Sequence, residues 1–178
     1  MGGMTDAPPP ADTDTRDWTF VIDSGCEQCG YAPHDPVTTP ARLRSLPPRW
    51  ATVLQRQDAA VRPREGTWSP VEYACHSRDL VGALGERIAA MLESRNPTFA
   101  DYDGEAEAVR GEFWAADPAQ VAREIEAAAA ASAMVLARVS DGDWDRTGRR
   151  GDGFTFTVTS LCRYLIHDLE HHLHDVDG

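Results

Sequence analysis

Four segments of the chain repeat apolar residues at three- and four-residue steps, the spacing that places them on one face of an α-helix. The segments cover residues 40–57, 69–96, 117–139 and 158–174. In the last segment leucine recurs at every fourth position, at residues 161, 165, 169 and 173. Each helix must bury its apolar face against the others, so the sequence predicts an all-α four-helix bundle.

Helix-start signals support two of these segments. Ser69 is a natural N-cap, Pro70 suits the first helical position, and Glu72 completes a capping box. The third segment begins with the same order of cap and proline, at residues 117–118. Two prolines at 47–48 interrupt the first segment, so its regular part is expected to begin near residue 47.

The rest of the chain divides into a leader and connecting segments. Residues 1–16 are rich in Pro, Asp and Thr and are predicted to form a disordered leader, followed by one domain over 17–178. Residues 18–22 are expected to form a short strand or an extended segment over the bundle. Residues 154–159 have β propensity, which leaves the start of the last helix open. The loop 98–116 is long enough to be functional.

Composition narrows the class of protein. The net charge of −12 argues against nucleic-acid binding, which needs a basic surface that neutralises phosphates. The sequence contains no apolar run long enough to span a membrane. Its first residues also lack the basic and apolar pattern of a secretion signal. We therefore expect a cytoplasmic protein with no membrane partner.

Four of the six histidines lie between residues 166 and 175. On a helix, His167 and His171 stack one turn apart, and two imidazoles at that spacing can bind one metal ion. A third ligand must come from elsewhere, and His76 in the second helix is the candidate because bundles build metal sites from facing helices. Three histidines would leave one coordination position open, as in catalytic zinc sites. The alternatives are a core histidine at 76 and a polar helix end at 167–171.

Other polar residues of this region have less certain roles. His172 lies 100° around the helix from His171, so it either supports a ligand or belongs to the surface. A histidine ligand usually donates its second ring N–H to a carboxylate. The candidates for that acceptor are Asp79, Asp168, Glu170 and Asp175.

The cysteines offer a second set of metal ligands. Cys26 and Cys29 form a Cys-x-x-Cys motif that resembles half of a zinc knuckle, for which His34 can supply only a third ligand. The alternatives are a tight turn with two free thiols and a reversible disulfide. Cys75 and Cys162 are predicted to be small core residues.

Three motifs together resemble the DinB-like (DinB/YfiT) superfamily. They are Trp-Ser-Pro-x-Glu-x-x-x-His at residues 68–76, His-x-x-x-His at 167–171, and Cys-x-x-Cys-Gly at 26–30, which resembles an N-terminal feature of actinobacterial members. The resemblance covers about residues 18–176. It implies a four-helix bundle with an N-terminal extended segment, frequently a homodimer. It also implies zinc or nickel held by three histidines, here His76, His167 and His171.

The resemblance also implies an activity. The family includes mycothiol-dependent maleylpyruvate isomerase and related thiol transferases, in which the metal is thought to activate a small thiol as a thiolate. We therefore expect a metal-dependent enzyme whose partners are a mycothiol-like thiol and an electrophile. Arg146, Arg149 and Arg150 are either anchors for these molecules or part of a mobile loop.

Two other functions use the same ligands. One is a metal-dependent hydrolase, for which Glu72, one turn before His76, is the candidate general base. The other is a non-catalytic metal-binding module of a stress response. The sequence does not separate these three functions.

Overall fold

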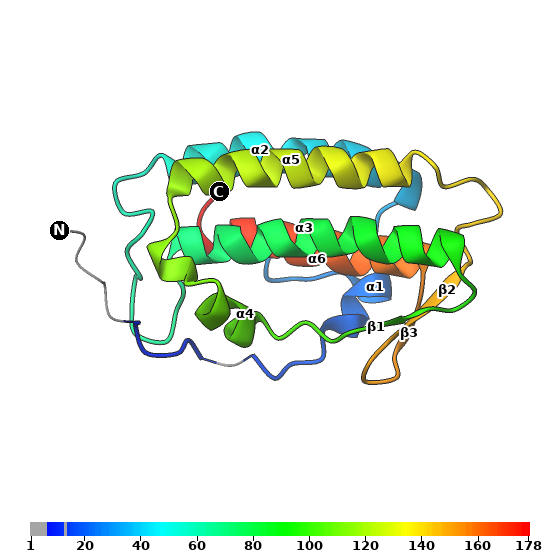
Figure 1. Ribbon diagram of the computed structural model, residues 1–178, viewed down its shortest axis with the longest axis horizontal. Helices are drawn as coiled ribbons and strands as arrows, with labels where there is room; N and C mark the ends of the chain where they lie inside the picture. The colour runs from blue at the N-terminus through cyan, green and yellow to red at the C-terminus, as the bar shows by residue number, and fades with distance from the viewer. Residues whose placement is uncertain (1–6, 13) are drawn as a thin grey trace.

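The protein is a bundle of four long helices, seen in a computed structural model that describes residues 7–12 and 14–178. Helices α2 and α5 lie side by side in one layer, and α3 and α6 form the second layer (Figure 1). Their bounds are α2 Thr39–Leu54, α3 Pro70–Glu93, α5 Pro118–Leu136 and α6 Val158–Asp175. The predicted four-helix bundle is therefore confirmed, and its apolar faces form one continuous core.

The helix ends follow the sequence signals. Ser69 Oγ accepts from Glu72 N, and Ser69 N donates to a Glu72 carboxylate oxygen, which is the predicted capping box. Thr157 and Ser160 form a second capping box at the start of α6. Helix α2, however, begins well before Pro47 and continues through both prolines. A proline removes one helical hydrogen bond, but its fixed φ is compatible with a helix, and here Pro47 is half-buried and Pro48 is exposed.

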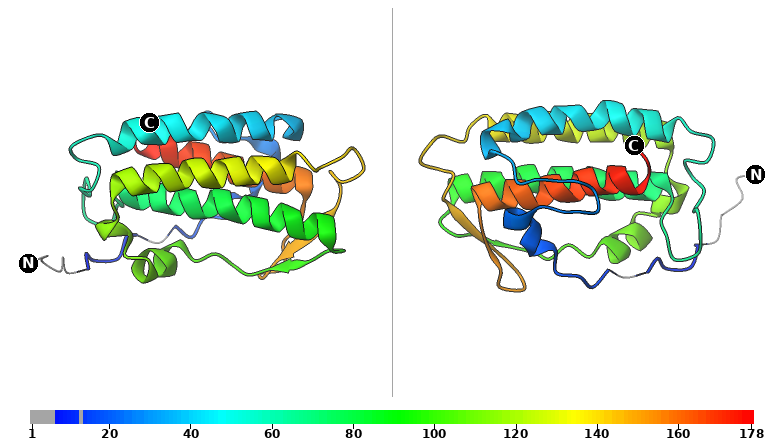
Figure 2. Two further views of the ribbon diagram at one scale, coloured as in Figure 1. Left: turned by 45° about the horizontal axis from the view of Figure 1, so that its top comes forward. Right: turned by 180° about the vertical axis from the view of Figure 1, so that it is seen from behind.

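The N-terminal segment is neither the strand nor the extended segment that was expected. Residues Trp18–Phe20 form a 3-10 turn that leads into the short helix α1, Val21–Ser24. Asp17 caps this turn by accepting a hydrogen bond from Thr19 N at 2.9 Å, so local capping outweighs the β propensity of the aromatic residues. The chain then crosses the outer face of α6 on its way to α2 (Figure 2, right).

The predicted leader falls partly on residues 1–6 and 13, which lie outside the described residues. Its described part packs against the domain, since Asp12 N donates to Gly66 O at 2.8 Å and Arg62 donates to Pro9 O at 2.5 Å.

A small sheet makes the strictly all-α prediction wrong in part. It contains β1 Thr98–Phe99, β2 Thr147–Arg150 and β3 Thr155–Thr157, in the order β1-β2-β3. Strand β1 pairs parallel to β2, and β2 pairs antiparallel to β3. The β-prone residues before α6 therefore pair with a partner strand. The predicted loop 98–116 also contains α4, Gly104–Arg110, and the 3-10 turn Phe113–Ala115.

Helices α3 and α5 approach each other closely at Gly85. A Cβ placed there would lie 2.5 Å from Ser132 Oγ and 3.1 Å from Ser132 Cα, while that hydroxyl donates to Val81 O at 2.7 Å. We expect Gly85→Ala to lower the free energy of unfolding by about 1–3 kcal/mol, as overpacking does. Chemical denaturation measures the change.

Gly82 is the matched control on the same helix. A Cβ there meets no atom within 4 Å, so Gly82→Ala should raise stability by up to about 1 kcal/mol through helix propensity alone. Two variants that change stability in the same direction would contradict the close approach at Gly85.

Candidate metal centre

Helix α6 presents two stacked pairs of metal-ligand side chains on neighbouring faces. His167 and His171 form one pair, and Asp168 and His172 form the other, each four residues apart. One residue of offset turns the second pair by 100° around the helix. The first pair faces the N-terminal segment and the second faces α3, because the helix is packed between them.

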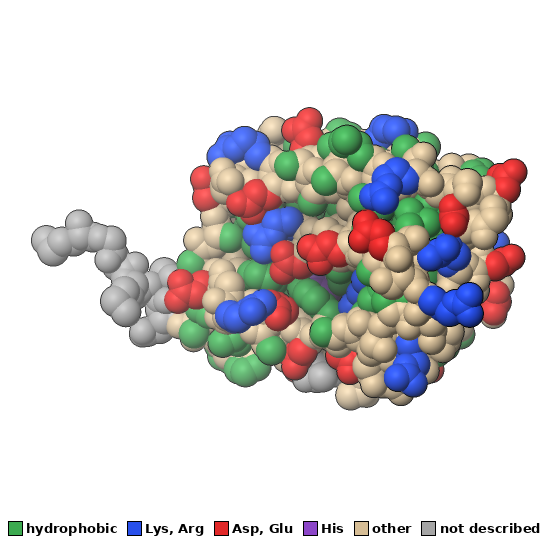
Figure 3. Space-filling view, turned by 45° about the vertical axis from the view of Figure 1, so that its right-hand side comes forward, with side chains coloured by type: hydrophobic (Ala, Val, Ile, Leu, Met, Phe, Trp, Pro, Cys, Tyr) green, Lys and Arg blue, Asp and Glu red, His purple; other side chains and the backbone are tan. Residues whose placement is uncertain are grey.

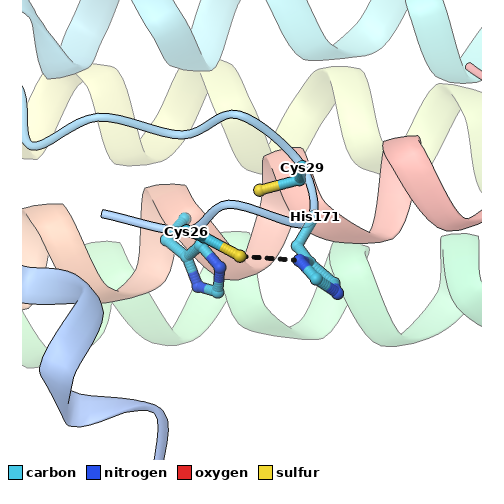
Figure 4. Close-up of side chains that lie close together, drawn as sticks. Cys26, Cys29 and His171 are labelled. Atoms are coloured by element: carbon cyan, nitrogen blue, oxygen red, sulfur yellow. Dashed lines mark hydrogen bonds between the residues drawn. The ribbon is translucent and has the colours of Figure 1, made fainter. Parts of the chain in front are cut away.

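The first pair meets the Cys-x-x-Cys turn. One ligand atom each of Cys26, Cys29, His167 and His171 lies within 4.8 Å of the other three. Cys26 Sγ lies 3.7 Å from His171 Nδ1 (Figure 4). His167 Nε2 is buried and has no hydrogen-bond partner among the described residues, which leaves a polar atom for a bound ion to satisfy.

The second pair meets His76 of α3. One ligand atom each of His76, Asp168 and His172 lies within 4.8 Å of the other two. The rings of His76 and His172 are 4.9 Å apart, and those of Trp68 and Tyr102 each lie 5.3 Å from the His76 ring. His76 Nδ1 is also buried without a partner. This group has two imidazoles and a carboxylate, as in zinc sites with three protein ligands and an open position.

Asp175 connects the two groups. One of its carboxylate oxygens lies 3.1 Å from His172 Nδ1, and the other lies 3.6 Å from His171 Nε2. Of the four carboxylates considered as histidine partners, Asp79 instead binds Arg78 and Tyr102, and Glu170 binds Arg42. Asp175 therefore orients the His172 ring by a hydrogen bond and also lies close to His171.

Burial keeps most of these histidines neutral. It lowers the pKa of His167 to about 4, lowers the pKa of His171, and lowers the pKa of His76 well below its usual value. His172 is the exception: burial opposes its charge, but Asp175 and Asp168 together raise its pKa. Neutral imidazoles offer free lone pairs, which is the form that binds a metal.

Burial also shifts the pKa of Cys29 and of Asp168. Burial raises the pKa of Cys29 to about 11, so without a cation beside it this side chain is a thiol at neutral pH. Burial likewise raises the pKa of Asp168, although His172 acts in the opposite direction. A bound cation would favour the ionised form of both groups.

A cavity of about 590 Å³ opens beside the His76–Asp168–His172 group, and His167 and His171 also border it. A histidine side chain is visible at the bottom of a hollow with acidic side chains beside it in Figure 3. The lining contains five Trp and Tyr side chains from several elements: Trp18, Trp68, Tyr73, Tyr102 and Tyr164. It also contains six carboxylates: Asp12, Asp14, Asp103, Glu105, Asp168 and Asp175. The volume suits a small organic ligand.

The structure distributes the predicted ligands over two groups. Among the described residues, His76 is grouped with Asp168 and His172, whereas His167 and His171 are grouped with the cysteines. His34, the other candidate third ligand of the cysteines, is occupied by Tyr31 and Thr39. Asp168 and His172 were not predicted to be ligands, although they have the same four-residue spacing as His167 and His171.

The other predicted site residues are not among the described residues that line the cavity, although Arg150 contacts Tyr164, which does line it. Arg146 donates to Met91 O, and Arg150 binds Asp152 and Tyr164. Arg149 is exposed, and none of the three is among the described residues that line the cavity. Glu72 is held by Arg62 and Ser69 and does not face the cavity, so it cannot be the general base considered above.

The chain belongs to the DinB superfamily, whose model matches residues 38–176. A similar solved structure is YfiT from Bacillus subtilis, described as "a probable metal-dependent hydrolase with an unusual four-helix bundle topology". Its TM-score is 0.70 at 15% sequence identity, over 96% of this chain and 95% of that chain. No curated protein matches the sequence. Within the described part of this chain, no helix has the length and hydropathy of a membrane span.

Proposed function

We propose that the protein is a metal-dependent enzyme that activates a low-molecular-weight thiol at the His76–Asp168–His172 group, for S-transfer or isomerisation. The observation that carries this proposal is the position of three ligands, from two facing helices, beside a cavity of about 590 Å³. A divalent cation such as zinc or nickel would lower the pKa of a coordinated thiol or water and so supply a nucleophile at neutral pH.

The chain's own residues hold the ligand group in place. Asp175 accepts a hydrogen bond from His172 Nδ1, which fixes the ring and leaves Nε2 near Asp168 at 3.4 Å. The rings of Trp68 and Tyr102 pack around His76, so its imidazole has little freedom to turn. Ligands that are fixed before substrate binding lose little conformational entropy when the site is used.

The wall of the cavity indicates the kind of thiol. Carboxylates accept hydrogen bonds from hydroxyl and amino groups, and six of them line the cavity. Arg16 is the one lysine or arginine among the described lining residues, so a polyanion is disfavoured. Flat aromatic rings offer apolar surfaces for a sugar-like ring. A hydroxyl-rich thiol such as mycothiol combines these properties.

Hydrolysis is the second candidate. The carboxylate of Asp168 makes the ligand group resemble the His₂-carboxylate sites of zinc hydrolases, and YfiT is described as a probable metal-dependent hydrolase. In this case the cavity would hold only the electrophile, and the nucleophile would be water. The two candidates therefore differ in whether a thiol binds.

We expect the zinc-loaded protein to bind mycothiol with the release of about one proton, because a coordinated thiol is deprotonated. Calorimetric titration in buffers of different ionisation enthalpy measures both the affinity for the thiol and the number of protons released. S-methylated mycothiol, which has no proton to lose, should bind without this release. His76→Asn and Asp168→Asn should lose the thiol-dependent proton release, whereas His174→Ala, an exposed histidine outside both groups, should keep it.

Equal proton release with the methylated compound would contradict thiol activation. Failure of mycothiol to bind, together with hydrolysis of activated esters that requires His76 and Asp168, would support the hydrolase instead. Circular dichroism of each variant checks that the bundle still folds.

A further inference from the structure

The Cys-x-x-Cys turn has a geometry that presents two thiols to α6. Cys26 N donates to Tyr31 O, and Gly30 N donates to Cys26 O, each at 2.9 Å. Gly25 and Gly30 have φ of 74° and 76°, and a Cβ at Gly25 would lie 2.5 Å from Tyr31 O. The turn is therefore closed by its backbone, and glycine is required at its entrance.

Four ligand side chains converge there without satisfying one another. Figure 4 shows Cys26 and Cys29 projecting from the turn beside His171. Cys26 Sγ lies 3.7 Å from His171 Nδ1, and the His167 and His171 rings are 5.2 Å apart. Cys26 and His167 are 5% and 2% exposed, and Nε2 of His167 is buried without a partner. A buried polar cluster with so few internal hydrogen bonds lacks the compensation that burial requires.

Aromatic rings cover the cluster. Trp18 lies 5.3 Å from the His167 ring and 5.1 Å from the His171 ring, and Tyr31 lies 5.4 Å from the His167 ring. His171 directs Nδ1 toward Cys26 and Nε2 toward Asp175, the arrangement of a histidine that binds a metal with one nitrogen while a carboxylate orients the other.

We propose that Cys26, Cys29, His167 and His171 bind one zinc ion in a closed, four-coordinate structural site, separate from the His76–Asp168–His172 group. Two thiols and two imidazoles are a known ligand set of structural zinc. Both S–H protons leave to solvent as the zinc–sulfur bonds form, and Zn²⁺ with two thiolates and two neutral imidazoles carries no net charge. A neutral complex suits a buried position.

The site would fix the N-terminal segment to the bundle. Residues 18–31 contribute both thiols and the covering rings, and His167 and His171 belong to α6. Trp18 and the two histidines also line the catalytic cavity. Zinc at the four-ligand site would therefore hold one wall of the cavity without taking part in the reaction.

Cobalt substitution tests this site independently of the catalytic one. The untagged, reduced protein should bind two equivalents of zinc by elemental mass spectrometry. Cobalt should replace them and show thiolate-to-metal charge transfer with no added thiol. Cys26→Ser/Cys29→Ser should lose one equivalent and the whole charge-transfer band. Asp168→Asn should lose the equivalent of metal bound at the cavity and keep the thiolate-to-metal charge-transfer band.

Cys75→Ala is the matched cysteine control, because Cys75 is a core residue outside the ligand group and its removal should keep both equivalents. In case the cysteine variants do not fold, chelation of wild-type protein provides a second readout. Loss of zinc should speed protease cleavage within residues 18–31.

Absence of the charge-transfer band in reduced wild-type protein would overturn the proposal. A Cys26→Ser/Cys29→Ser variant that still binds two equivalents of zinc would also overturn it. Two fewer free thiols in the native protein, recovered only after reduction, would show that the pair is a disulfide rather than a zinc site. None of these results depends on thiol activation at the cavity.

Discussion

Arg62→Ala is expected to lower the free energy of unfolding by about 3–5 kcal/mol, the cost of leaving a buried charge without its partner. Glu72 is fully buried, and Arg62 Nε donates to both of its carboxylate oxygens, at 3.1 and 2.9 Å. Burial raises the pKa of Glu72, but the hydrogen bonds from Arg62 and Ser69 outweigh it and the net shift is downward. Equilibrium denaturation at pH 7 measures the loss.

Three controls separate charge from packing. Arg64→Ala removes an exposed arginine from the same loop and should change stability by less than about 0.5 kcal/mol. Glu72→Gln in the Arg62→Ala background removes the buried charge but keeps a capping-box residue, so it should recover part of the loss. A double-mutant cycle with no coupling between the two positions would contradict this account.

The same pair predicts a dependence on pH. Because the folded pKa of Glu72 lies below its unfolded value, its contribution to stability is complete above the unfolded pKa and disappears as pH falls through the folded pKa. The difference between wild type and Arg62→Ala should therefore shrink in acid.

The metal-free protein is expected to lose about 3 kcal/mol of stability through His34 alone as the pH falls from 7 to 4. Burial, followed by the charges of Arg42 and Arg163, lowers the pKa of His34 from 6.5 to about 4. The unfolded chain therefore binds a proton over this interval and the folded chain does not. Stability is complete above pH 6.5 and falls as the pH decreases toward 4.

In the His34→Gln variant, the free energy of unfolding should fall less steeply between pH 6.5 and 4. The difference in slope should be about 1.4 kcal/mol per pH unit, which corresponds to one proton. The amide remains neutral and can still hydrogen-bond near Tyr31 and Thr39, whose hydroxyls each lie 2.9 Å from a ring nitrogen of His34. Urea titrations of both proteins at half-unit pH intervals, in the presence of chelator, give the two slopes. His174→Gln at an exposed position is the control, and identical slopes for wild type and His34→Gln would contradict the prediction.

The two ligand groups give α6 two roles. One face contributes Asp168 and His172 to the cavity, and the neighbouring face contributes His167 and His171 to the contact with the N-terminal segment. Asp175 touches both groups, at 3.1 Å from His172 and 3.6 Å from His171.

The sequence by itself determined the four helices, because apolar spacing and capping are local properties. The Ser69–Glu72 capping box and the leucine repeat of α6 appear in the structure as predicted. The strands were not predicted as a sheet, since β1 pairs with residues about fifty positions away and a strand needs its partner to form. The β propensity of residues 18–22 predicted a strand or an extended segment, whereas the cap from Asp17 favours a helical turn there.

The candidate site was determined by sequence only in part. The spacing of residues 167–172 places two stacked pairs on α6, of which only His167 and His171 were predicted to be ligands. Only the tertiary structure decided that Asp168 and His172 face His76, while His167 and His171 face the cysteines. The rotation of α6 about its own axis depends on where its apolar face is buried, and a rotation of 100° exchanges the two pairs. That rotation is set by packing against α2, α3 and the N-terminal segment together, so no local pattern contains it.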